Sequence, residues 1–316
     1  MTVSLQAYLD NLEEETYELM VGTGDSNALS YGFTKKRAVH PGVSGKMIPP
    51  PMAPQKWVEL MEHEPDMTKK RMVYIHIPFC SHICLYCGFF QNFINEDREQ
   101  RYVERLLKEL EMAKEDKMLQ AKPMQCVFFG GGTPSALSPA NITKVLQKLK
   151  ECIPLTNDCE ITMEARIYDL QKERIEAWFA NGVNRVSIGV QSFDTKIRQA
   201  SGRLDTKETV MDRLKLISSY DQASIIVDII FGLPGQTLES FMEDLACIDS
   251  LPISGMDLYQ LNLFGGSHMA KAIQKGSLPP AATRAEQAVM FAAAEKWLND
   301  RGYKRLSNCH WAKDIR

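Results

Sequence analysis

Short apolar runs alternate with amphipathic segments along most of the chain, from Arg71 onward. The run MVYIHI at Met72–Ile77 and the run SIIVDIIF at Ser224–Phe231 are typical of strands buried in a sheet. Apolar residues at helical spacing in the intervening segments are typical of helices that pack on one side. The predicted strands cover residues 72–77, 126–129, 160–165, 185–190, 224–231 and 256–263, with 303–307 as one more, and the predicted helices cover 97–117, 139–153, 170–181, 206–219, 238–250 and 283–301.

The regular alternation of strand and helix indicates the fold class. Consecutive βα units form parallel sheets, because each helix returns the chain to the starting edge of the next strand. Six such units favour an α/β fold of the incomplete (β/α)6 TIM-like barrel type, and a flat doubly wound sheet remains the alternative. In both architectures ligands bind at the carboxyl ends of the strands. The most unusual segments follow those ends: three cysteines after the first strand, GGGTP after the second and GLPGQ after the fifth.

The N-terminal part of the chain differs from this pattern. We interpret residues 1–70 as an N-terminal extension, 71–265 as the main domain and 266–316 as the start of a C-terminal region. Within the extension, an acidic segment predicts a short helix over residues 5–20. The proline run at 48–54 predicts an extended connector, because proline removes a backbone donor and restricts φ.

Composition excludes some classes of protein. The chain has 316 residues, a formal net charge of −3 and a pI near 6.1. This charge argues against non-specific nucleic-acid binding, which depends on a basic surface. No early segment resembles a secretory leader, and no apolar run is long enough to span a bilayer. We therefore expect a cytoplasmic protein that binds no nucleic acid and does not insert into a membrane.

Three of the eight cysteines lie close together, at Cys80, Cys84 and Cys87, in a CxxxCxxC pattern. Disulfide frameworks are rare in cytoplasmic proteins, so clustered cysteines indicate metal binding or catalysis. Soft thiolates favour an iron–sulfur cluster, and three thiolates on a four-iron cluster leave one iron open. A zinc site with His76 or His82 as fourth ligand is the alternative. The sequence has no second ligand pair of the kind that structural zinc sites use, which favours the cluster.

Several motifs together resemble the radical SAM superfamily, in the subgroup related to oxygen-independent coproporphyrinogen III oxidase (HemN). They are YIHIPFC followed by two further cysteines and CGF, then GGGTP, GVQSF and DIIFGLPGQT, in this order within residues 72–264. The resemblance implies a [4Fe-4S] cluster on Cys80, Cys84 and Cys87, whose open iron is chelated by S-adenosylmethionine (SAM). It also implies reductive cleavage of SAM to a carbon radical that abstracts hydrogen from a substrate.

The resemblance assigns SAM contacts to positions along the whole barrel. Glycines let backbone N–H groups approach a ligand closely, and a carboxylate at the end of the third strand suits the ammonium or ribose groups. Asp228 interrupts the apolar run IIVDIIF, and burying an unpaired carboxylate is unfavourable, which itself favours a ligand-binding role. The residue type at Asn262 differs from the family pattern. The candidates are Tyr74, Tyr86, Gly130, Gly131, Gly132, Thr133, Glu164, Gln191, Arg203, Asp228 and Asn262.

The substrate is predicted from Phe89, which lies two residues after the third cysteine. Coproporphyrinogen dehydrogenases have a further cysteine at this position, so Phe89 argues against their substrate. HemW heme chaperones share the phenylalanine, but their cysteine motif lies near the N-terminus. CGFF and the long extension most resemble the ChuW/HutW group of anaerobic heme-degrading methyltransferases. That resemblance implies heme or a related tetrapyrrole as substrate, a second SAM as methyl source, and ring opening with iron release. Coproporphyrinogen oxidation and a HemW-type chaperone role are the alternatives.

Two further segments are candidate heme contacts. The basic run KKR at 35–37, with His40, suits heme propionates or axial ligation, although such runs are most often solvated loops. His268 follows the sixth strand on the active-site side. We expect a reductase or a flavodoxin-type protein as electron donor. The sequence SNCHW at 307–311 resembles the start of the family's C-terminal region, and relatives continue well beyond it, so we expect the chain to be part of a longer protein.

Overall fold

The computed structural model describes residues 10–14, 17, 46–89 and 92–313. The strands of its central sheet are β1 (Met72–Ile77), β4 (Met124–Gly131), β5 (Leu155–Arg166), β6 (Arg185–Gln191), β7 (Ser224–Phe231), β8 (Gly255–Gln260), β9 (Lys304–Arg305) and β10 (His310–Ala312). They pair in the order β1-β4-β5-β6-β7-β8-β10-β9. The strands from β1 to β8 are parallel and follow chain order, whereas β10 and β9 are antiparallel additions beside β8.

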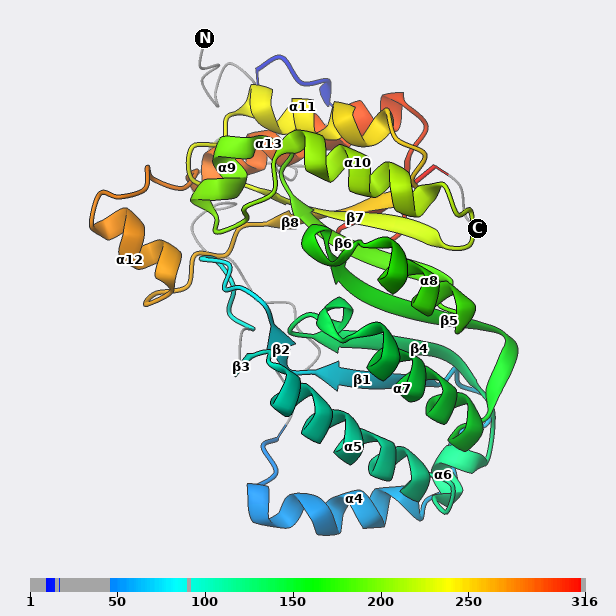
Figure 1. The fold of residues 1–316 in the computed structure, drawn as a ribbon. Coiled ribbons are helices and arrows are strands. Elements are labelled where there is room, and N and C mark those ends of the chain that lie inside the picture. The colour runs from blue at the N-terminus through cyan, green and yellow to red at the C-terminus, as the bar shows by residue number, and fades with distance from the viewer. Residues whose placement is uncertain (1–9, 15–16, 18–45, 90–91, 314–316) are drawn as a thin grey trace.

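A long helix follows each of the parallel strands, and these helices cover one face of the sheet (Figure 1). Their apolar sides bury residues such as Leu106, Leu146 and Trp178 against outward-facing strand residues such as Val127 and Ile188. This arrangement is the predicted incomplete (β/α)6 TIM-like barrel. The helices are α5 (Glu96–Met112), α7 (Pro139–Cys152), α8 (Lys172–Ala180), α10 (Lys207–Ser218), α11 (Leu238–Asp249) and α13 (Arg284–Asp300).

The opposite face of the sheet, which is the inner face of the barrel, carries many polar side chains. Alternate residues of a strand point to opposite faces. Ile75 and Ile77 belong to the apolar core under the helices, so Tyr74 lies on the inner face of β1. Val227 and Met256 also belong to that core, which places Asp228 of β7 and Asp257 of β8 inward. Ionisable groups therefore line the inside of the barrel and reach the edge at which the strands end.

Capping residues determine where the helices begin. Asn95 accepts a hydrogen bond from the backbone N–H of Arg98 at 2.9 Å, at the start of α5. Thr237 and Thr283 begin α11 and α13 with reciprocal capping boxes. Such side chains pair N–H groups that the first helical turn leaves unsatisfied. Because α11 begins a few residues after β7 ends, the Thr237 cap also stabilises the loop between them on the active-site side.

The proline run does not form the predicted extended connector. Pro50–Met52 forms a short 3-10 turn, and helix α4 (Ala53–Met61) begins directly after it. Proline is tolerated in the first helical turn, where its missing N–H would have no partner. The prediction was wrong because Pro54 lies in that turn, not in the helix interior.

Other element boundaries also differ from the prediction. The helix expected over 97–117 is divided into α5 and the short α6 (Lys117–Gln120), and the strand expected over 303–307 is divided into β9 and β10. The sixth strand ends at Gln260. Four short elements were not predicted: β2 (Phe79–Cys80), β3 (Asn92–Phe93), α9 (Thr195–Ala200) and α12 (His268–Gln274).

Some predictions for the extension lie outside the described residues. These are most of the helix expected over 5–20, the basic run at 35–37 and His40. Within the described part of the chain, no helix combines the length and the apolar character needed to cross a bilayer.

Candidate active site

A pocket lies where the cysteine loop meets the carboxyl ends of β4, β5, β6 and β7. It brings together segments that are far apart in the sequence, as the barrel prediction requires. Ten predicted residues line it: Cys80, Cys84, Tyr86, Cys87, Gly132, Thr133, Glu164, Gln191, Arg203 and Asp228. The lining also includes His82, Ala165, Arg166, Ser187 and Gly189, for which no role in SAM binding was predicted.

The cysteine loop is held by backbone contacts on both sides. β2 pairs with β3, with Cys80 opposite Phe93. The N–H of Gly132 donates a hydrogen bond to the carbonyl oxygen of Ile77 at 2.8 Å. A Cβ on Gly132 would lie 2.6 Å from the carbonyl oxygen of Phe79, so only glycine allows this approach. The GGGTP loop therefore packs directly on the backbone that leads into Cys80.

Each cysteine sulfur has a hydrogen-bond donor beside it. Donors of this kind orient sulfur ligands and stabilise the negative charge of the thiolate that binds a metal. The pairs are Thr133 Oγ1 to Cys80 Sγ at 3.2 Å, Phe89 N–H to Cys87 Sγ at 3.3 Å, and the Arg166 guanidinium to Cys84 Sγ.

Two arginines act on Cys84 electrostatically. Burial of Cys84 favours the neutral thiol, but the positive charges of Arg203 and Arg166 outweigh it and hold the thiol pKa below its ordinary value. Arg166 is fixed by a second hydrogen bond, to the carbonyl oxygen of His82 at 2.9 Å. By contrast, burial raises the pKa of Cys80, although the Thr133 hydroxyl opposes this shift.

The spacing of the three sulfurs distinguishes between the two predicted metal centres. A tetrahedral zinc ion with Zn–S bonds near 2.3 Å holds its sulfurs roughly 3.8 Å apart. Cys80, Cys84 and Cys87 do not form a set whose ligand atoms all lie within 4.8 Å of one another, and neither His76 nor His82 completes such a set with them. The nitrogen Nδ1 of His76 instead lies 3.2 Å from the hydroxyl of Tyr74. Wider spacing suits a larger iron–sulfur cluster placed among the thiols.

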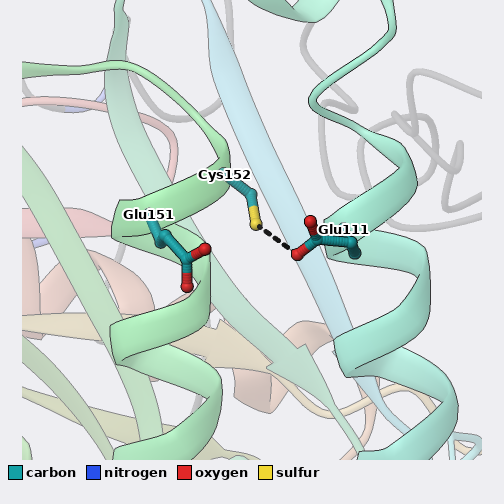
Figure 2. A group of neighbouring side chains, drawn as sticks. All are labelled: Glu111, Glu151 and Cys152. Atoms are coloured by element: carbon teal, nitrogen blue, oxygen red, sulfur yellow. Dashed lines mark hydrogen bonds between the residues drawn. The ribbon is translucent and has the colours of Figure 1, made fainter.

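Among the described residues, Glu111, Glu151 and Cys152 are three possible ligands whose atoms do lie within 4.8 Å of one another. They lie at the ends of α5 and α7 (Figure 2). Lys114 and Lys148 form ion pairs with both glutamates. Hydrogen bonds from these lysines lower the pKa of both carboxyl groups. The lysines thus already neutralise the acidic charge that a metal ion would need, so this group is a surface ion-pair network.

Two carboxyl groups, Glu164 and Asp228, give the pocket its acidic character. Burial raises the pKa of Glu164 to about 7, and the charge of Asp228 adds to the shift. Burial likewise raises the pKa of Asp228 to about 7, with a contribution from Asp257, while a hydrogen bond from Ser187 Oγ at 3.0 Å opposes it. Bringing a positive charge beside these groups would restore their ionised forms. The pocket therefore favours a cationic ligand, and the sulfonium and ammonium groups of SAM meet this requirement.

The opposite wall of the pocket is built around Arg203. Its Nε and Nη2 donate to the hydroxyl of Tyr86 at 3.2 and 3.0 Å, and its Nη1 donates to the carbonyl oxygen of Gly189 at 2.6 Å. A Cβ on Gly189 would lie 2.8 Å from Gln191 Nε2 and 3.1 Å from Arg203 Nη2. Gln191 itself has a φ of 74°, at an irregularity in the pairing of β6 with β7. Gly189, followed by the left-handed backbone at Gln191, thus allows the side chains of Gln191 and Arg203 to line the pocket together.

The remaining predicted contact residues do not belong to the lining of this pocket. Gly131 donates its N–H to Glu164, whereas Tyr74 stacks on Phe128 with ring centroids 6.1 Å apart. Asn262 lines a different pocket, beyond the end of β8. His268 is the first residue of α12. The roles assigned to these four residues, like those of the residues that line the pocket, remain predictions.

Comparisons with known proteins agree with this geometry. Residues 74–248 match the family model described as Radical SAM superfamily. Anaerobilin synthase of Escherichia coli O157:H7 is 36% identical over 286 residues, which cover 90% of this chain and 63% of that protein. The heme chaperone HemW of Lactococcus lactis is 34% identical over 197 residues, which cover 62% of this chain and 50% of that protein. The chain thus spans about half to two thirds of the length of these relatives.

The fold is also similar to that of a solved structure. The solved structure of E. coli coproporphyrinogen III oxidase (HemN) has a TM-score of 0.69 and 23% sequence identity, covering 82% of this chain and 58% of that one. Members of the matched family bind a [4Fe-4S] cluster and SAM, and the donor-assisted thiols and the acidic pocket beside them fit both groups. The chain belongs to the radical SAM superfamily.

Proposed function

We propose that this chain contains the catalytic barrel of an enzyme that methylates heme and opens its ring under anaerobic conditions, with release of iron. The observation that carries the proposal is the 36% identity to an anaerobilin synthase over 90% of the chain. Phe89, where a cysteine would indicate coproporphyrinogen oxidation, supports the same substrate. We further propose, from the resemblance to the heme-degrading group, that the reaction is cytoplasmic, that a second SAM is the methyl source, and that a reductase or flavodoxin-type protein is the electron donor.

The residues of the pocket have distinct tasks in this reaction. Cys80, Cys84 and Cys87 would hold the cluster, which together with SAM supplies electron transfer and radical chemistry when bound. Glu164 and Asp228 balance the positive charge of the ligand. Arg166, Arg203, Thr133 and the glycine loop hold the sulfurs and the pocket walls in position, which reduces the entropic cost of orienting the reacting groups.

Exposed apolar side chains near the cysteine loop support a planar, largely apolar substrate. Phe89 is 77% exposed, Phe264 is 54% exposed and Phe93 is 48% exposed. The ring of Phe264 lies 3.6 Å from the position of a Cβ on Gly88, next to Cys87. Large exposed aromatic groups of this kind commonly mark a binding surface. A tetrapyrrole stacked on them would lie beside the cluster.

The test is anaerobic incubation of the full-length protein, with a reconstituted cluster, reductant and SAM, with heme or separately with coproporphyrinogen. We expect loss of the Soret band and a methylated linear tetrapyrrole by mass spectrometry, with no carbon dioxide released from coproporphyrinogen. A Cys87→Ala variant, which lacks one cluster ligand, is the control and should yield no product. An unchanged heme spectrum from protein with an intact cluster would contradict the proposal.

A heme-binding role without turnover is the second candidate, and the 34% identity to HemW favours it. In that case heme would bind stoichiometrically and could be passed to an acceptor protein while SAM is not consumed. Measuring SAM cleavage in the same incubations separates the two functions.

A further inference from the structure

A second cavity lies on the inner face of the sheet, toward the amino ends of β5, β6 and β7 and bounded by β10. Its volume is about 590 Å³, within the usual range of small-molecule and cofactor pockets. Its lining is mostly polar and carries charges of both signs, with Asp158 among the acidic groups, and its apolar side chains are those of Ile226, Leu306 and Ala312. The lining also includes Glu160, Arg185, Ser224 and His310.

His310 is the residue of this cavity best suited to bind a metal. β10 pairs antiparallel with β8, which places His310 opposite Asp257. The Nδ1 atom of His310 lies 3.0 Å from Asp257 Oδ1, and the two side chains are 19% and 10% exposed. The carboxylate accepts the Nδ1 proton, which leaves a lone pair on Nε2. Among the described residues, none forms a hydrogen bond with Nε2.

This geometry is typical of histidines that ligate metals. Such histidines usually donate their other ring N–H to a carboxylate, which fixes the ring and makes the ligating nitrogen more basic. In heme proteins a histidine held in this way is a common axial ligand to iron. The neighbouring thiol is a poorer candidate, because burial and the charge of Asp257 raise the pKa of Cys309.

The position of His310 is compatible with a substrate beside the SAM pocket. Asp257 is opposite Asp228 in the pairing of β8 with β7, and Asp228 lines the SAM pocket. Adjacent strands lie about 4.8 Å apart, so His310 lies roughly 10 Å from Asp228 across two strands. A macrocycle bound to His310 would therefore extend toward the place where SAM binds.

Arg185 supplies a complementary charge in the same cavity. It is partly buried, and in the described part of the chain it forms no hydrogen bond or ion pair. The nearby Glu160 accepts a hydrogen bond from the hydroxyl of Thr162 at 3.0 Å. A guanidinium group pairs well with a carboxylate, and the propionates of heme are carboxylates. Ile226 and Leu306 offer apolar contact for the macrocycle.

We propose that His310 is an axial ligand to the iron of heme bound in this cavity, that Asp257 orients its ring, and that Arg185 pairs with a propionate. The inference rests on the proposed function in taking heme as the substrate. It adds a defined binding mode, which can be tested without turnover.

The test titrates the full-length, cluster-loaded protein, without SAM or reductant, with ferric heme and, in parallel, with iron-free protoporphyrin IX. We expect His310→Ala to lose the histidine-ligated heme spectrum and to bind heme at least about tenfold more weakly, while protoporphyrin binding is unchanged, because only heme offers iron. Exogenous imidazole should restore the spectrum. Arg185→Gln should weaken both ligands, and Asp257→Asn should lower the frequency of the ferrous iron–histidine stretch. His63→Ala, which removes an exposed histidine after helix α4, is the control and should match the parent protein.

Three outcomes would overturn the inference: an unchanged heme spectrum in His310→Ala, a thiolate-type spectrum in the parent protein, or an equal loss of heme and protoporphyrin binding in a folded variant. If His310→Ala does not fold by circular dichroism, His310→Gln, whose amide can still bond to Asp257, takes its place under the same criteria. If the parent protein binds protoporphyrin and heme without histidine ligation, the axial assignment fails while the proposed function stands. If it binds neither, the proposed function fails as well.

Discussion

Replacing Gly132 with alanine tests whether the GGGTP loop holds the cysteine loop in place. The new Cβ would lie 2.6 Å from the carbonyl oxygen of Phe79 and 2.9 Å from its carbonyl carbon and its nitrogen. These are backbone atoms, so no side-chain rotation relieves the contact, and the loop carrying Thr133 must move away from Cys80. Overpacking of this kind costs about 2 kcal/mol, which corresponds to a fall in Tm of roughly 4–8 °C.

The assay has two readouts that depend on the same displacement. Thermal unfolding of the cluster-free protein measures the strain. Iron and sulfide content after reconstitution measures the cluster site, and we expect it to fall because Thr133 no longer donates to Cys80, a contact of 3.2 Å in the parent protein.

Gly88→Ala is the matched control, because Gly88 is adjacent to Cys87 but has room for a methyl group. The nearest atom to a Cβ there belongs to the side chain of Phe264, at 3.6 Å. This variant should keep both the Tm and the iron content of the parent protein. The reasoning is refuted if Gly132→Ala matches the parent in both readouts, or if both alanine variants lose iron equally.

Three further predictions follow from the charges. Burial raises the pKa of Glu164 and of Asp228 to about 7, so the affinity of cluster-loaded protein for SAM should rise between about pH 6 and pH 8 as the two groups ionise. The stability of the ligand-free protein should fall as the pH rises toward 7, because the unfolded chain loses these protons at lower pH. Equilibrium dialysis with labelled SAM measures the first effect and urea unfolding the second, and two flat pH profiles would contradict the prediction. Arg198→Leu should lower the free energy of unfolding by about 3 kcal/mol, because Arg198 is 1% exposed and donates to the backbone carbonyl oxygens of Val190, Ser192 and Asp205, whereas Lys196→Ala should leave it unchanged; equal urea midpoints would count against this role. Glu151→Gln should leave both the urea midpoint and the metal content unchanged, because its ion pairs are exposed, and a loss of bound metal would show that a metal site was overlooked.

The repeating part of the fold was predictable because its signals are local. Apolar runs such as the one around Asp228 identify strands that are covered by helices, and capping residues such as Thr237 and Thr283 mark helix starts. The cysteine triplet is also local, since its members lie within one loop. The order of parallel strands then follows from chain order, because each helix connects neighbouring strands.

The missed features depend on contacts between distant segments. Arg166 reaches Cys84 across 82 positions, and β10 has only three residues, paired with a strand about fifty positions earlier. No local sequence pattern predicts such contacts. Among the missed residues, Asp257 is the one that a local signal could have identified. It is a carboxylate inside the strand GMDLYQ, and the same signal identified Asp228. Applied evenly, that reasoning would have found it.

The left-handed backbone of Gln191 limits how this protein can be stabilised by engineering. An L-residue in that conformation costs about 1–2 kcal/mol, whereas glycine adopts it without strain but at some entropic cost to folding. At φ 74° the chain keeps a long amide beside Gly189 and Arg203. Engineering that replaces strained backbone positions to raise thermal stability would choose glycine here and would remove the amide from the pocket lining. Position 191 should therefore be left unchanged in any stabilised version of the enzyme.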